Sequence, residues 1–255
     1  MNRDTDCRVW PALGPSSGTF SGRTGAGWRG VIWAILVIMG AFFGNPISLA
    51  AAELDLRRYE ADVRKFERMD ATNPPPADGV LFTGSSSIVK WAGLKADFPG
   101  IPVLNRGFGG STWRELNAYF PRLVARYQPR AVVVYEGDND LNAGRTVAEC
   151  LADFDEFCRL MRLHLPEVPV AVLSVKPSPI RRGQRALQTE LNAAIERRLA
   201  GMAHWKLLDV GRVLLDAHGE MRPELYEADQ LHLKRAGYEC WLPVMRTWVE
   251  KFGGP

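Results

Sequence analysis

Three consecutive serines, Ser85 to Ser87, directly follow an apolar run in the stretch VLFTGSSSIVKW. A serine hydroxyl acts as a nucleophile when a base takes its proton, another group orients that base, and donors stabilise the oxyanion that forms. Of four histidines, His232 has the most suitable neighbour, because Asp229 precedes it by three residues. At this spacing a turn can bring the carboxylate to Nδ1 and leave Nε2 free for a hydroxyl. The other three histidines have ordinary structural interpretations, at a helix end, at a strand start and in a surface turn.

The elements that must position these residues alternate along the chain from Glu53 onward. Short apolar runs bounded by Gly, Pro or Asn predict buried parallel strands at 79–84, 101–107, 130–137, 168–177 and 204–211. Apolar residues at helical spacing predict helices at 54–70, 112–126, 146–164, 184–200 and 234–251. The pattern predicts one α/β domain, a three-layer α/β/α sandwich with a five-stranded parallel sheet.

Ligands of such sheets bind outside the carboxyl ends of the strands, near the point where the strand order reverses. The residues that follow each expected strand are therefore the candidates for a site. Ser86 follows the first strand within G-S-S, Gly110 follows the second within G-G-S, and Asn139 follows the third within G-D-N-D. Together with Asp229 and His232 they form an ordered set of motifs that is more specific than any one of its members.

This set, in this order, resembles the SGNH, or GDSL-type, hydrolase superfamily over roughly residues 79–248. The resemblance implies a flavodoxin-like SGNH-hydrolase fold and no cofactor or metal. It implies that Ser86 is the nucleophile, His232 the general base and then acid, and Asp229 the carboxylate that orients the histidine. The backbone N–H groups of Ser86 and Gly110 and the side-chain amide of Asn139 are the implied oxyanion hole.

One residue departs from the pattern of the superfamily. Ser85 stands where the superfamily has an aspartate, and it cannot supply that charge to the loop. Ser87 is expected to help cap the helix that follows. The alternative G-x-S-x-G nucleophile elbow is absent, because position 88 is Ile88 instead of glycine.

The acidic segment after the third expected strand has two interpretations. Asp138, Asp140, Asn142 and Glu149 fall at positions 1, 3, 5 and 12 of a calcium-loop template, but the position that normally holds glycine is occupied by Ala143. We therefore prefer the other interpretation, in which Asp140 makes a cap or hydrogen bond that fixes the loop of Asn139.

Two cations and three tryptophans also stand near the expected site. Arg106 and Lys176 lie at strand ends, where each could meet an anionic group of a substrate or pair with the acidic segment. Trp91, Trp113 and Trp241 are expected to be core residues, because aromatic residues at helical spacing usually are.

The N-terminal segment is expected to be separate from the fold. Residues 31–44 form a short apolar stretch with a basic flank, and small residues follow up to Ala52, as in a secretory signal peptide. The alternative is an uncleaved membrane anchor that tethers the protein through residues 31–52. The expected organisation is then a signal or anchor at 1–52, an N-terminal helix and Pro-rich connector at 53–78, and the hydrolase domain at 79–252. The protein is expected to be exported, to a periplasmic or extracellular location.

Charge and cysteine usage exclude little. The formal net charge is +3 with no run of Lys or Arg after residue 52, so nucleic acid is not an expected partner. Cys150 and Cys158 are expected to share a helix about 12 Å apart, too far to bridge, so any disulfide would involve Cys240. We expect buried free thiols.

The resulting hypothesis is a serine esterase that cleaves a small-molecule or polysaccharide ester through an acyl-Ser86 intermediate. An O-acyltransferase acting on cell-envelope polysaccharide could use the same site, with a sugar hydroxyl in place of water. A catalytically silent binding module on the same fold is the third interpretation.

Overall fold

The computed structural model describes residues 54–254, and the predicted signal or anchor at 1–52 lies outside them. Five strands form one parallel sheet, in the order β2-β1-β3-β4-β5. The strands are β1 (Val80–Gly84), β2 (Val103–Gly107), β3 (Ala131–Tyr135), β4 (Val170–Leu173) and β5 (Trp205–Leu208). The chain moves outward from β1 to β2 and then crosses back to β3, so the strand order reverses at β1 and β3, where the fold class places ligands.

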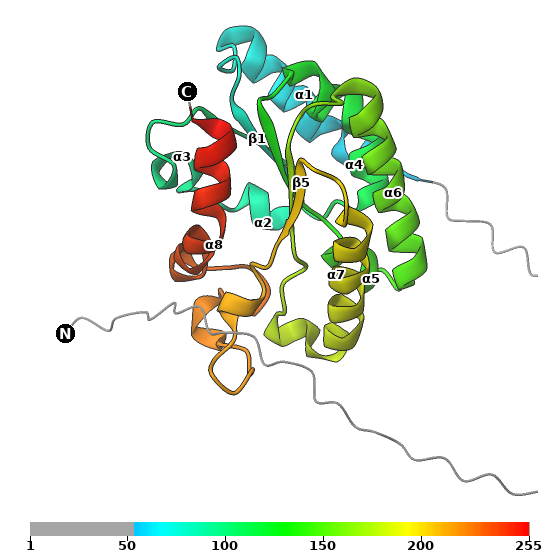
Figure 1. The fold of residues 1–255 in the computed structure, drawn as a ribbon, viewed down its shortest axis with the longest axis vertical. Coiled ribbons are helices and arrows are strands. Elements are labelled where there is room, and N and C mark those ends of the chain that lie inside the picture. The colour runs from blue at the N-terminus through cyan, green and yellow to red at the C-terminus, as the bar shows by residue number, and fades with distance from the viewer. Residues whose placement is uncertain (1–53, 255) are drawn as a thin grey trace, which may run out of the picture. The chain divides into compact units, whose positions relative to one another are not determined.

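Helices cover both faces of the sheet, so that the domain has three layers (Figure 1). One face packs against α1 (Arg57–Thr72), α4 (Trp113–Leu123), α6 (Val147–His164) and α7 (Arg185–Leu199). The other packs against α2 (Ser86–Val89), α3 (Leu94–Asp97) and α8 (Arg235–Gly253). Short elements complete the connections: η1 (Ala125–Tyr127), α5 (Asp138–Asn142), η2 (Pro179–Gln184), η3 (Arg212–Leu214) and η4 (Pro223–Leu225). The predicted three-layer, flavodoxin-like α/β/α architecture is confirmed.

Burial on both faces explains why the strands read as continuous apolar runs. Successive side chains of a strand point to opposite faces, and in β1 Leu81 enters one core while Val80 and Phe82 enter the other. All three are fully buried. A strand with only one buried face would instead alternate apolar with polar residues.

Three strands, β3, β4 and β5, end earlier than the apolar runs that predicted them. The run at 168–177 predicted a long fourth strand, whereas β4 stops at Leu173. Beyond it, the side-chain amide of Asn192 on α7 accepts the Val175 N–H at 2.7 Å and donates to its C=O at 2.9 Å. A side chain thus satisfies backbone groups that a neighbouring strand would otherwise pair, so the strand can end before the apolar run does.

Arg106, at the end of β2, has a structural partner that neither sequence interpretation named. Its guanidinium pairs with Asp70 at the end of α1 and donates to the Tyr127 hydroxyl at 2.7 Å. It also lies 4.9 Å from the ring centroids of both Phe66 and Tyr127. The expectation that Arg106 binds a substrate or the acidic segment is therefore wrong, because Asp70 of α1 is its counterion.

Other core predictions are confirmed. Trp91, Trp113 and Trp241 are at most 2% exposed. Cys150 and Cys158 share α6 and are buried free cysteines. No helix between residues 54 and 254 has the length and apolar character needed to cross a membrane.

Candidate active site

Ser86 is positioned by a sharp turn at the end of β1. Gly84 has a φ of +117°, and a Cβ there would collide with the carbonyl oxygen of Tyr135 on β3, so only glycine fits. The Ser85 N–H continues the sheet by donating to that carbonyl at 3.0 Å, and Ser86 then opens α2. Ser86 is partly exposed, whereas Ser85 and Ser87 are only 2% and 3% exposed. Of the three serines, Ser86 is therefore the one that a substrate can reach.

Ser87 does not cap the helix, so that prediction is wrong. Helix α2 begins at Ser86, which places Ser85 at the N-cap position and Ser87 inside the helix. The Ser85 side chain makes no capping hydrogen bond. The carbonyl oxygen of Ser87 accepts a hydrogen bond from the Tyr238 hydroxyl of α8 at 2.9 Å.

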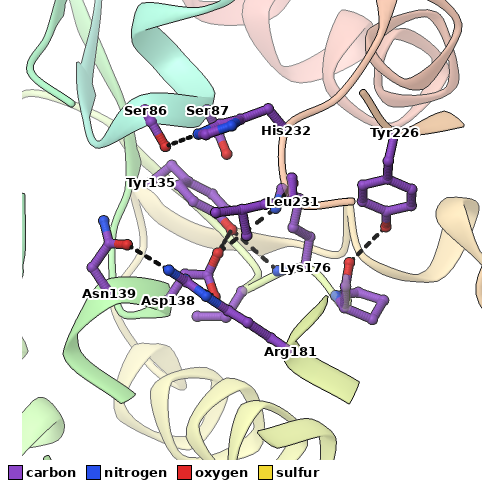
Figure 2. Close-up of polar contacts among 12 residues, drawn as sticks. Ser86, Ser87, Tyr135, Asp138, Asn139, Lys176, Arg181, Tyr226, Leu231 and His232 are labelled. Atoms are coloured by element: carbon purple, nitrogen blue, oxygen red, sulfur yellow. Dashed lines mark hydrogen bonds and ion pairs between the residues drawn. The ribbon is translucent and has the colours of Figure 1, made fainter. Parts of the chain in front are cut away.

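The loop before α8 brings Asp229 and His232 to Ser86. His232 Nε2 lies 3.0 Å from Ser86 Oγ (Figure 2), and His232 Nδ1 lies 2.6 Å from Asp229 Oδ2. The loop is closed by a bond of 2.7 Å from the Glu227 N–H to the His232 carbonyl. The structure thus joins Ser86 to His232, which lies 146 positions later in the sequence, and His232 to Asp229, which precedes it by three. These residues are the predicted nucleophile, base and orienter.

Backbone donors fix the carboxylate of Asp229. Its Oδ1 accepts the N–H groups of Leu231 and His232, each at 3.0 Å. The hydrogen bonds from the His232 side chain and backbone lower the pKa of Asp229 well below its usual range. Asp229 therefore keeps its negative charge opposite Nδ1, and Nδ1 carries a proton toward it.

The three predicted oxyanion donors lie on the segments that follow β1, β2 and β3. The backbone N–H groups of Ser86 and Gly110 have no acceptor among residues 54–254. Gly110 has a φ of +85°, and its carbonyl accepts the Tyr59 hydroxyl at 2.7 Å, which holds the loop after β2. Asn139, on α5, donates one amide hydrogen from Nδ2 to the Ser111 carbonyl at 2.9 Å and has a second hydrogen available.

The chain was compared with protein-family models, and the model of the GDSL-like Lipase/Acylhydrolase family matches residues 76–240. The chain belongs to this family. The GDSL-like hydrolase cleaves ester bonds as members of an acylhydrolase family do. None of the curated proteins matches it.

Solved structures show how widely this fold is used. A GDSL-like lipase from Bacteroides thetaiotaomicron is 19% identical, with a TM-score of 0.62, over 75% of this chain and 98% of the other. A variant of an acetyl-xylooligosaccharide esterase from Geobacillus stearmophilus is 16% identical, with a TM-score of 0.53, over 71% and 96%. The OSK domain of Drosophila Oskar is 14% identical, with a TM-score of 0.53, over 66% and 87%. At these identities the likeness shows the fold alone.

In the GDSL-like hydrolase, the acidic segment after β3 folds as helix α5 instead of a calcium loop. Asp140 accepts the N–H groups of Gly137 at 3.1 Å and Trp113 at 3.2 Å, which ties α5 to the start of α4. Its role in fixing the loop of Asn139 is thereby confirmed. Burial raises the pKa of Asp140 to about 7. Asp138 turns to Arg181 and Lys176 instead, so the two aspartates do not converge on one point.

Glu136, between β3 and α5, is a buried carboxyl beside the site. It is 1% exposed, and its Oε1 accepts the Ser111 hydroxyl at 2.5 Å. Burial, and then the neighbouring Asp140, raise the pKa of Glu136 well above its usual range. Folding therefore favours the protonated form of this carboxyl more than the unfolded chain does.

We expect Glu136→Gln to raise the Tm relative to the wild type, with a gain that grows as the pH rises above about 5. The unfolded chain releases the Glu136 proton above an ordinary pKa of about 4.3. The stability from the protonated form is therefore complete below that pH and is lost as the pH rises through the folded-state pKa. Glutamine keeps the oxygen that accepts from Ser111 and does not titrate. The exposed Glu190 on α7 offers a control, Glu190→Gln, and an equal pH dependence of Tm in both variants would contradict the assignment.

One contact of the site could not be predicted from the sequence. Arg181, in η2, donates from Nη2 to Asn139 Oδ1 at 3.0 Å (Figure 2). Nothing distinguishes Arg181 from the adjacent Arg182 in the run PIRRGQR. For Lys176 the predicted pairing with the acidic segment is confirmed, since its Nζ lies 3.6 Å from Asp138 Oδ2.

Proposed function

We propose that the GDSL-like hydrolase cleaves carboxylic esters through an acyl-Ser86 intermediate. The observation that carries this proposal is the continuous chain from Asp229 Oδ2 through both ring nitrogens of His232 to Ser86 Oγ, with contacts of 2.6 and 3.0 Å. Such a chain converts a weakly acidic hydroxyl into a nucleophile, because the base that takes the proton is held in one orientation.

The first half of the reaction forms the acyl-enzyme. His232 Nε2 takes the proton of the Ser86 hydroxyl while Oγ bonds to the ester carbonyl carbon, and the electron pair of the carbonyl moves onto its oxygen. The tetrahedral intermediate then collapses, the bond to the leaving alcohol breaks, and His232 gives that alcohol its proton. Asp229 stabilises the imidazolium throughout, because its carboxylate remains ionised.

The second half repeats these steps with water. His232 takes a proton from water, the hydroxide adds to the acyl carbon, and the Ser86 oxygen leaves with the proton that His232 returns. The products are the carboxylic acid and free Ser86. In both halves we assign the oxyanion to the N–H groups of Ser86 and Gly110 and to the second amide hydrogen of Asn139.

The class of substrate follows only in part from this site. A small-molecule or polysaccharide ester fits a partly exposed nucleophile, and the acyl and alcohol groups depend on loops around the site. We also propose that the protein acts outside the cytoplasm, on the grounds of the pattern in residues 1–52. N-terminal sequencing of the mature protein tests cleavage after Ala52, and an intact N-terminus at the membrane would favour the anchor.

Covalent labelling with a fluorophosphonate tests the proposed nucleophile. We expect one equivalent of label per chain on Ser86 and none on the Ser86→Ala variant, because phosphonylation requires an activated serine. Intact-protein mass spectrometry measures the stoichiometry, and peptide mapping assigns the residue. Absence of label on the wild type would support the silent binding module and overturn the proposal.

A second measurement separates hydrolysis from transfer. With an ester that carries a labelled acyl group, we expect the label only in free acid when water and an acetylation-competent oligosaccharide are both present. Label in the oligosaccharide would establish the O-acyltransferase instead, since that reaction differs only in the nucleophile that attacks the acyl-enzyme.

A further inference from the structure

A buried cluster of charges, Asp138, Lys176 and Arg181, lies beneath the proposed active site and takes no direct part in the chemistry described above (Figure 2). Arg181 Nη1 lies 2.7 Å from Asp138 Oδ1, and Lys176 Nζ lies 3.6 Å from Asp138 Oδ2. The Tyr135 hydroxyl donates to the same Oδ2 at 3.2 Å. One carboxylate therefore serves two cations.

The cluster is too buried to be an ordinary surface network. The side chains of Lys176, Asp138 and Arg181 are 1%, 6% and 9% exposed. Removing such charges from water is unfavourable, and a buried ion pair is often less stabilising than apolar residues of the same volume. Stability alone is therefore a weak reason for this cluster, and its contacts with the site provide a better one.

The first contact fixes the orientation of the Asn139 amide. A guanidinium has only donors, so Arg181 can bind only the oxygen of that amide, at 3.0 Å. The Ser111 carbonyl is only an acceptor, so it must bind the nitrogen, at 2.9 Å. Both contacts require the same orientation, in which Nδ2 faces the site. Without Arg181 the Ser111 carbonyl alone opposes the rotation that would present Oδ1, an acceptor that repels an oxyanion.

The second contact holds the loop that carries the histidine. Lys176 Nζ donates to the carbonyl oxygen of Leu231 at 2.9 Å, one residue before His232. The loops are joined a second time where the Ile180 N–H donates to the Gln230 carbonyl at 3.3 Å. The cations that Asp138 holds thus reach two groups of the proposed machinery, the oxyanion donor and the base.

We propose that Arg181 and Lys176, held by Asp138, are positioning residues of the esterase. Arg181 turns the Asn139 amide so that its N–H₂ faces the oxyanion, and Lys176 fixes the backbone next to His232. This inference rests on the proposed function, and it predicts that the two cations act through different groups and can be separated by experiment.

The main test compares Arg181→Lys with Arg182→Lys. The first keeps the charge beside Asp138 and removes the planar fork that reaches both Asp138 and Asn139. The control changes the adjacent arginine, whose side chain is 63% exposed and pairs with Glu220 at 3.3 Å. With p-nitrophenyl acetate we expect Arg181→Lys to lower kcat about 10- to 100-fold with KM within twofold, as for loss of an interaction made only in the transition state. Arg182→Lys should match the wild type.

A double-mutant cycle distinguishes positioning from a structural role. Asn139→Ala should lower kcat about 10²- to 10³-fold, and in that background Arg181→Lys should cost less than a further twofold, because the group it positions is gone. Lys176→Met should lower kcat about tenfold in both backgrounds, since it acts on the histidine loop. Tm values and circular dichroism show the folded fraction of each variant. If Arg181→Lys lowers kcat as much in the Asn139→Ala background as in the wild type, the positioning role of Arg181 is overturned.

The fluorophosphonate reaction distinguishes failure of the proposed esterase function from failure of the positioning role of Arg181. If Ser86 of the wild type is not labelled and the wild-type protein hydrolyses no ester, the proposed function fails. If Ser86 is labelled, and Arg181→Lys reacts as fast as the wild type and has its kcat, the positioning role fails while the function stands. We expect a labelled wild type and an Arg181→Lys variant that is labelled more slowly in the same proportion as its kcat.

Discussion

Ser86→Ala should lower kcat/KM for p-nitrophenyl acetate by at least about 10⁴-fold. Removing the serine of a Ser-His-Asp site abolishes covalent catalysis and leaves only the contributions of the oxyanion donors and of binding. The methyl group of alanine fits the partly exposed position of Ser86 at the start of α2, so the variant should keep its fold. Initial rates over a range of substrate concentrations measure the loss, and the Tm confirms the fold.

The neighbouring serines provide matched controls. Ser85→Ala and Ser87→Ala each remove one hydroxyl from the same triplet, but neither hydroxyl is among those that contact His232. We expect both variants to keep kcat/KM within about tenfold of the wild type, with changes mainly in Tm because both side chains are buried. A loss at Ser85 or Ser87 as large as that at Ser86 would contradict the assignment of the nucleophile.

Non-additivity gives a stricter criterion for the same site. If Ser86 and His232 act as a unit, the Ser86→Ala/His232→Ala double variant should be no slower than Ser86→Ala, since a base without a nucleophile contributes nothing. Further slowing in the double variant would show that His232 acts on another group, such as water attacking the ester directly.

The residues that could be predicted are those whose position depends on local pattern. The strands were predictable because both faces of the sheet are buried, which leaves an unbroken apolar run such as AVVVY in β3. The positions of Ser86, Gly110 and Asn139 were predictable because each lies within four residues of the end of a strand, and the carboxyl ends of parallel strands share one edge. Asp229 and His232 were predictable from their spacing, since their bond closes within one turn.

The residues that could not be predicted have partners far away in the sequence. Arg181 and Asn139 are 42 positions apart, and Arg106 and Asp70 are 36 apart. That a residue is arginine does not specify which acceptor it binds, because any buried carboxylate or amide oxygen satisfies its donors. The error at Ser87 has a local cause. The turn at Gly84 starts α2 two residues earlier than a cap at Ser87 would require, and that shift moves Ser87 from the cap into the helix.

Asp229→Asn should lower kcat by about 10⁴-fold near neutral pH, and the reason lies in the backbone of the loop. Asp229 Oδ1 accepts the N–H groups of Leu231 and His232, each at 3.0 Å. In the variant the amide oxygen must keep these two donors, so its N–H₂ group turns toward His232 Nδ1. An N–H facing Nδ1 stabilises the tautomer that carries its proton on Nε2, which cannot accept the proton of Ser86.

The control for this change is Asp216→Asn, and its outcome decides between a specific and a general effect. Asp216 also accepts two backbone N–H groups in a turn, those of His218 and Glu220, each at 2.8 Å, and hydrogen bonds likewise lower its pKa. The Asp216→Asn variant therefore loses a charge in an equivalent turn that does not contact Ser86 or His232. We expect its kcat to equal that of the wild type. NMR of the His232 ring nitrogens should show Nε2 protonated in Asp229→Asn and Nδ1 protonated in the wild type. A variant with full activity, or with the wild-type tautomer, would show that Asp229 does not orient the base.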